Sequence, residues 1–180
     1  LGDMQNGRID IAGKLDASAP QGGNGGFIET SAADVATGRA VQIDAGAAHG
    51  QGGHWLIDPY NYTIDASAAN NIAGALNLGT SVTVTTQSSN SSYGATGSGS
   101  GDITVASAIS KTSGGDATLT LRADRNIAVN GDISSAAGKL GLTLSAANAS
   151  GATMGGVDIN ANLNTNGGNI LVGGASGTAV

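Results

Sequence analysis

The sequence predicts an all-β chain that winds as a right-handed parallel β-helix. Three observations carry this prediction: a long alternation with a period of two residues, a repeated seven-residue pattern, and a composition rich in glycine and poor in large rings. At about 24 residues per coil the chain would wind about seven times, each coil about 4.8 Å above the last. Right-handed winding follows from the handedness of parallel strand connections.

The alternation is clearest over residues 116–133. Odd positions there are small or aliphatic except for Arg125, and even positions are mostly polar. The run is much longer than an average strand of about 5–6 residues. It therefore indicates several short strands joined by corners that keep the same face inside.

The repeated pattern is aliphatic–x–aliphatic–x–x–x–aliphatic, and it occurs at residues 9–15, 103–109, 127–133 and 157–163. A glycine-containing corner and a second strand-like run follow each copy, at residues 27–30, 118–121, 142–144 and 170–172. A repeat of about 20–30 residues with tight corners is typical of a solenoid. Asn130-Gly131 alone would favour a hairpin, but the aligned copies lack that signal, so we expect parallel stacking.

The composition indicates which side chains fill the core and which classes of partner are excluded. The chain has 31 Gly, one Phe, one Trp and three Tyr, so thin layers of Ile, Leu, Val and Ala must fill the core. Glycine and asparagine suit the corners, and Thr, Ser and Asn suit the outward faces. With a net charge of −6 and no basic cluster, we expect no nucleic-acid partner; with no long apolar run, we expect no membrane insertion. The absence of cysteine excludes disulfides.

Two stretches depart from the pattern. Trp55-Leu56-Ile57 is apolar on both faces, which predicts a short covering segment near residues 54–78. Residues 70–78 favour a helix with Ile72, Ala75 and Leu76 facing the sheet, and Leu78 is a further candidate for that face. Residues 87–101 are a Gly/Ser-rich run that predicts a flexible loop. We interpret residues 1–180 as a single solenoid segment of a longer secreted protein.

Several stretches resemble a known family. In order, GGNGGFIETSA, WLIDPYNYTID, NIAGALNLGTSVTVTT and GDITVASAISKTSGGDATLTLRADRNIAVNGDISS resemble the filamentous haemagglutinin-like exoproteins of Gram-negative bacteria, which leave the cell by two-partner secretion. The similarity covers roughly residues 7–174. It implies a parallel β-helix in a long fibre, secreted to the bacterial cell surface through an outer-membrane pore. It also implies host-cell or bacterial surface glycans or proteins as partners, and it supplies no general catalytic set.

Candidate chemistry is sparse. Most acidic residues lie at glycine-containing corners, among them Asp102, Asp116 and Asp132, where a carboxylate usually caps backbone N–H groups. We therefore expect no catalytic residues and no enzyme activity.

Two histidines and a group of aromatic residues remain as site candidates. His49 and His54, with Asp44 and Asp58 nearby, lie across a glycine-rich segment that predicts no fixed geometry, so we expect neither a metal nor a cofactor. Trp55, Tyr60 and Tyr62 are candidates for a platform that stacks sugars, although packing of a covering segment is the favoured interpretation.

The leading functional hypothesis is a non-catalytic structural or adhesive shaft. A carbohydrate-binding or polysaccharide-degrading β-helix stays open, and so does a passive stalk of a contact-dependent toxin. A groove with two carboxylates and an aromatic floor would favour the carbohydrate-active class. Strand edges exposed at the two ends also predict end-to-end self-association.

Overall fold

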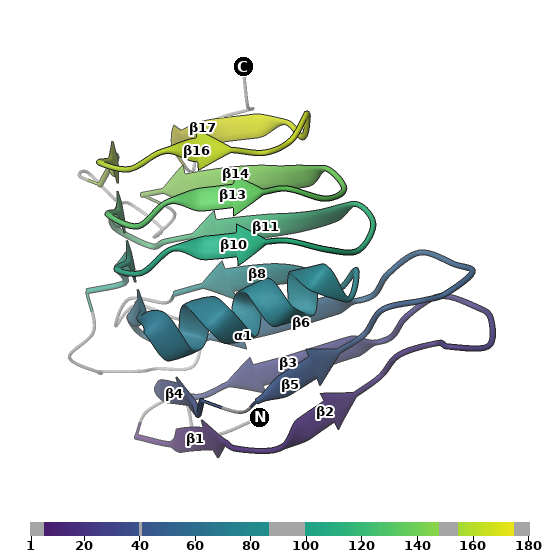
Figure 1. Cartoon of the computed structure of the whole chain (residues 1–180). Helices are drawn as coiled ribbons and strands as arrows, with labels where there is room; N and C mark the ends of the chain where they lie inside the picture. The colour runs from purple at the N-terminus through teal and green to yellow at the C-terminus, as the bar shows by residue number, and fades with distance from the viewer. Residues whose placement is uncertain (1–5, 40, 87–99, 148–154, 175–180) are drawn as a thin grey trace.

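The protein is a parallel β-solenoid of about five turns. The computed structural model describes residues 6–39, 41–86, 100–147 and 155–174. In Figure 1 the first described residues lie at the bottom of the rod and the last described residues at the top. The front strands β10 (Ile109–Lys111) and β13 (Ile133–Ser135) run to the right as the chain climbs, and the rear strands β8 (Ser81–Thr85) and β11 (Ala117–Arg122) run to the left. The coil is therefore right-handed.

Three walls enclose the core. The first wall is one six-stranded sheet of β3 (Phe27–Ser31), β6 (His54–Asp58), β8 (Ser81–Thr85), β11 (Ala117–Arg122), β14 (Leu140–Ala146) and β17 (Ile170–Gly174). The second wall holds β1 (Arg8–Ile11) and β4 (Asp34–Thr37), then β7 (Tyr62–Ile64), β9 (Ile103–Val105), β12 (Ile127–Val129) and β15 (Val157–Ile159). The third wall holds β2 (Lys14–Asp16) and β5 (Gln42–Asp44), then α1 (Ala66–Asn77), then β10 (Ile109–Lys111), β13 (Ile133–Ser135) and β16 (Leu163–Asn164).

All strand pairs are parallel, and like residues stack on like. One ladder in the first wall joins aligned residues of successive turns, all pointing inward: Ile28, Trp55, Val82, Leu119, Leu142 and Ile170. The Asn130-Gly131 dipeptide forms a corner and not a hairpin, because both of its N–H groups donate to Val105 of the preceding turn, at 2.9 and 3.0 Å. The predicted parallel stacking is confirmed.

The coil count is lower than the seven predicted, because the turns are unequal and mostly longer than 24 residues. First-wall strands begin at residues 27, 54, 81, 117, 140 and 170, so only the turn from β11 to β14 is close to the assumed length. The lower turns carry long excursions at residues 17–26 and 45–53, and α1 lengthens a third. The predicted loop at 87–101 falls largely outside the described residues, since 87–99 are among those not described.

The helix occupies a place in the third wall, between β5 and β10 (Figure 1), so it is part of the coil and not the separate covering segment predicted near residues 54–78. It is longer than predicted and begins earlier, because the Asp65 carboxylate accepts from Ser67 N and Ala68 N at 2.9 Å and caps its first turn. Its buried residues recur three to four apart: Ala68, Ala69, Asn71, Ile72, Ala73, Ala75 and Leu76. Leu78 is 50% exposed and does not face the sheet, which corrects its assignment as a sheet-facing candidate.

Within the described residues, no helix is both long and apolar enough to cross a membrane.

Candidate functional site

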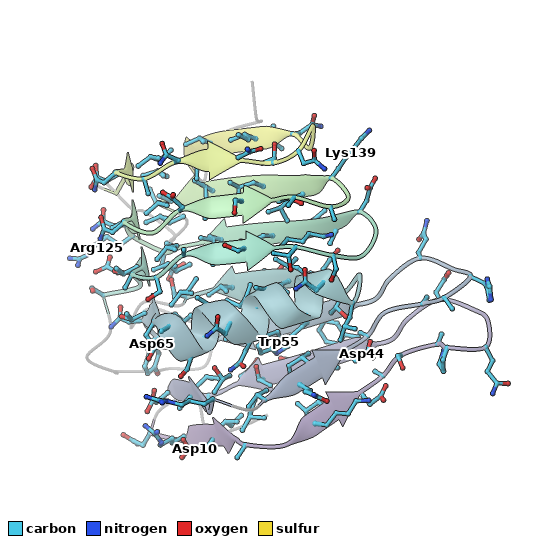
Figure 2. All side chains as sticks on the ribbon, viewed as in Figure 1. Asp10, Asp44, Trp55, Asp65, Arg125 and Lys139 are labelled. Atoms are coloured by element: carbon cyan, nitrogen blue, oxygen red, sulfur yellow. The ribbon has the colours of Figure 1, made fainter. Side chains whose placement is uncertain are left out.

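The three aromatic candidates for a sugar platform lie inside the rod. Trp55 is fully buried, and its indole N–H donates to the Thr30 hydroxyl at 3.2 Å (Figure 2). Tyr60 and Tyr62 are 6% and 5% exposed, and burial raises the pKa of the Tyr62 phenol to about 12. The rings therefore pack the core and offer no open face on which a sugar would stack.

The structure does not bring the histidine and aspartate candidates together. Asp44 accepts from Gly46 N at 2.9 Å, Asp58 is buried at the end of β6, and His49 lies in the excursion at residues 45–53. Among the described residues no group of three or more His, Asp or Glu side chains has the geometry to hold a metal.

The corner aspartates bind the next turn of the coil. Asp116 accepts from Lys139 N at 2.8 Å, and Asp132 accepts from Asn162 N at 2.9 Å. Asp102 forms a bidentate ion pair with Arg125, whose Nε and Nη2 donate to the two carboxylate oxygens at 2.8 and 2.5 Å. The Arg125 guanidinium lowers the pKa of Asp102 to about 2, with further help from the Ser100 hydroxyl and Asn126 N. The predicted capping role is confirmed at these three corners.

The corner between the third and first walls is also fastened from inside. Lys111 is fully buried, and its ammonium donates to Ser113 O at 2.6 Å, Gly114 O at 3.2 Å and Ala137 O at 2.5 Å. Burial lowers the pKa of Lys111. One turn later Ser135 donates to Ala137 O and Gly138 O, and in the turn above Thr165 donates to Gly168 O. These bonds hold the corner carbonyls in place, so the outer surface of this edge is a fixed shape.

Sequence reasoning missed an exposed aromatic pair on the first wall. Phe27 and His54 occupy the same register position on β3 and β6, and their rings stack with centroids 6.1 Å apart and planes 7° apart. Phe27 is 58% exposed, and burial lowers the pKa of His54. Two glycines precede each ring, 27 residues apart. The Gly-Gly pair before each ring was the signal in the sequence that could have aligned the two residues. It identifies them as neighbours only when the length of this turn, 27 residues, is known.

A two-layered arm leads into this pair. The excursions at residues 17–26 and 45–53 lie one on the other and extend past the corners of the upper turns (Figure 1). Gly25 N donates to Gln51 O and Gln51 N donates to the Asn24 side chain, both at 2.9 Å. A Cβ on Gly50 would lie 2.0 Å from Gly23 O, so glycine is required for the two layers to meet.

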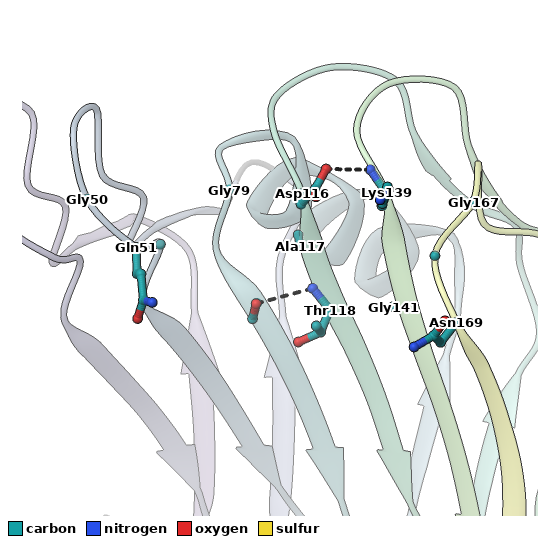
Figure 3. Close-up of a pocket in the computed structure, with 13 residues that line it drawn as sticks. Gly50, Gln51, Gly79, Asp116, Ala117, Thr118, Lys139, Gly141, Gly167 and Asn169 are labelled. Carbon is teal, nitrogen blue, oxygen red and sulfur yellow. Dashed lines mark hydrogen bonds between the residues drawn. The ribbon is translucent and has the colours of Figure 1, made fainter.

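A trough of about 600 Å³ begins at the arm and continues up the corner between the third and first walls (Figure 3). Its polar lining comes from five turns and includes Gln51, Ser81, Asp116, Thr118, Lys139 and Asn169; glycines fill most of the rest. The Ser81 hydroxyl accepts from Thr118 N at 3.2 Å, which fixes the floor. The described lining holds one carboxylate, Asp116, whereas acid–base glycoside hydrolysis uses a pair of carboxylates.

Fold and site together define the class of protein as a parallel β-solenoid with a shallow, rigid trough along one edge. Neither models of protein families nor curated proteins give a match to this chain.

Proposed function

We propose that this chain is a non-catalytic structural and adhesive shaft segment of a large secreted surface exoprotein of the filamentous haemagglutinin-like kind. The observation that carries the proposal is the unbroken parallel stacking of the first wall, in which each of the four strands between β3 and β17 bonds the strands of the turns below and above. The order of the motifs that resemble this family supports the proposal as well.

The mechanism of a shaft is geometrical. Each turn buries its inward ladder against its two neighbours, so stability builds up turn by turn and folding can propagate along the chain. Hydrogen bonds between turns, such as Lys139 N to Asp116 and Arg125 to Asp102, fix the register in which the apolar side chains stack. The carboxylates of Asp116 and Asp102 therefore join successive turns.

Secretion to the bacterial cell surface through an outer-membrane two-partner-secretion pore is part of the same proposal, as are surface glycans or proteins as partners. Turn-by-turn folding outside the cell would need no ATP. A passive stalk that carries a toxin has the same geometry; joining this segment to different terminal domains would separate the two roles.

The sharpest test of a modular shaft is removal of one complete turn. Deletion of residues 117–139 removes β11, β12 and β13 and lets β14 follow β8, with Leu142 on Val82 as Leu119 is now. We expect a folded rod shorter by about 4.8 Å in small-angle X-ray scattering. A matched deletion of residues 117–128 leaves an incomplete turn and should unfold the chain.

Loss of β-structure in the whole-turn deletion would contradict the shaft. The secretion route is tested separately, by fusing the chain behind a two-partner-secretion signal region and expressing it with and without the pore. Equal surface display in both strains would refute pore-dependent export.

A further inference from the structure

The exposed aromatic pair and part of the trough lining lie in one column of the first wall. Phe27, His54, Ser81, Thr118 and Gly141 occupy one outward column of the first wall, strand by strand. Ser81, Thr118 and Gly141 line the trough. The arm, whose two layers lead directly into Phe27 and His54, forms the lower end of the trough. From Phe27 to the first residues of the top turn the column crosses six strands, about 24 Å at about 4.8 Å per strand.

The column and the trough combine an apolar aromatic ring with mainly uncharged polar groups. One end offers an exposed flat apolar ring, and the remainder offers the amide groups of Gln51 and Asn169 and the hydroxyl group of Thr118. Asp116 and Lys139 are neighbours in the lining of the trough, where the Asp116 carboxylate accepts from the backbone N–H of Lys139 (Figure 3), and their formal charges sum to zero. An occupant must therefore carry many hydroxyl or amide groups and at least one apolar face, with little net charge.

Two other classes of ligand fit less well. A polyanion needs clustered cations, whereas the described lining of the trough holds one lysine and one aspartate, in a chain of net charge −6. An extended peptide usually adds to an open strand edge or inserts side chains into apolar pockets. The trough follows corners between paired strands, and its lining is mainly glycine and polar groups.

We infer that this surface binds a neutral oligosaccharide along the axis of the rod, with a sugar ring stacked on Phe27 and the following sugars in the trough. The C–H face of a pyranose packs on an aromatic ring, and its hydroxyl groups pair with amides, hydroxyls and backbone groups. The length of the column requires an extended oligomer. The inference deepens the adhesive part of the proposed function, by giving a ligand class to the shaft.

The test is isothermal titration calorimetry of the full chain with four neutral hexasaccharides, built of glucose, mannose, galactose or N-acetylglucosamine. Heparin and a mixture of unstructured peptides are the comparison probes. We expect at least one neutral hexasaccharide to bind, and Phe27→Ala to weaken it about tenfold, the loss of one aromatic contact. Thr118→Arg fills the trough from an exposed position and should abolish the remaining affinity.

Two control variants lie on other walls. Ile159→Ala removes an exposed apolar side chain from β15, and Ser110→Arg adds the same charge as Thr118→Arg on β10. Both should bind as the parent does, and circular dichroism of all four variants checks that each is folded.

Absence of binding by every neutral hexasaccharide, or equal binding by Phe27→Ala and Thr118→Arg, overturns the inference. Binding of heparin or peptides alone overturns it too. The shaft proposal is tested by the turn deletion and is unaffected by any of these results.

Discussion

Replacement of Trp55 by alanine probes the largest side chain in the core. Trp55 is fully buried between Ile28 below and Val82 above, and its indole N–H donates to Thr30. Truncating a buried tryptophan costs about 3–5 kcal/mol, because the cavity is filled only in part by its neighbours. That is a large share of a typical unfolding free energy of about 5–15 kcal/mol. We expect a marked loss of stability.

The assay is urea unfolding followed by far-ultraviolet circular dichroism, since Trp55 is the sole tryptophan and its fluorescence disappears with it. Trp55→Phe keeps a ring but loses the N–H, and should cost about 1–2 kcal/mol. Phe27→Ala is the matched surface control and should change stability by about 0.5 kcal/mol or less.

A change below about 1 kcal/mol for Trp55→Ala would refute the assignment of Trp55 to the core, because no buried tryptophan of this kind is so cheaply removed. The same holds if Trp55→Ala and Phe27→Ala prove equal. Loss of sugar binding in a fully stable Trp55→Ala protein would restore this ring as a binding platform.

Three further predictions concern the helix, a corner and an ion pair. Asp65→Ala removes the cap of α1 and should cost about 1 kcal/mol in urea unfolding, with Asp65→Asn milder. Gly138→Ala should cost about 1–3 kcal/mol, since Gly138 has φ +67° and a Cβ there would lie 2.4 Å from Gly115 O; Gly115→Ala meets nothing within 4 Å and should be near neutral. The pKa of Asp102 is lowered from 3.8 to about 2, so its bond to Arg125 stabilises fully above about pH 4 and fades as the pH falls toward 2. The pair is partly exposed, so Asp102→Asn should remove about 0.5–1 kcal/mol at pH 7 and flatten the acid limb of a stability–pH curve; an unchanged limb contradicts the pairing.

The part of the fold that could be predicted is the inward or outward direction of side chains that alternate along a strand. Leu119 and Leu121 point inward because side chains of a strand alternate between faces, and the repeat places Ile103, Ile127 and Val157 above one another. The corner aspartates were predictable for the same reason, since capping depends on the few residues around them. The sequence by itself thus determined the class of fold and the identity of most inward residues.

Only the tertiary structure decided the features that depend on how far one turn extends before the next begins. Among these features are the position of α1 in the third wall and the number of turns, which is lower than predicted. The inward direction of Lys111, toward backbone carbonyls, and the burial of Trp55 belong to them as well. The tertiary structure likewise decided the stacking of Phe27 on His54 and the trough beside them. Contacts between turns join residues some 23–36 positions apart, and their register depends on every corner between them, so no local pattern specifies them.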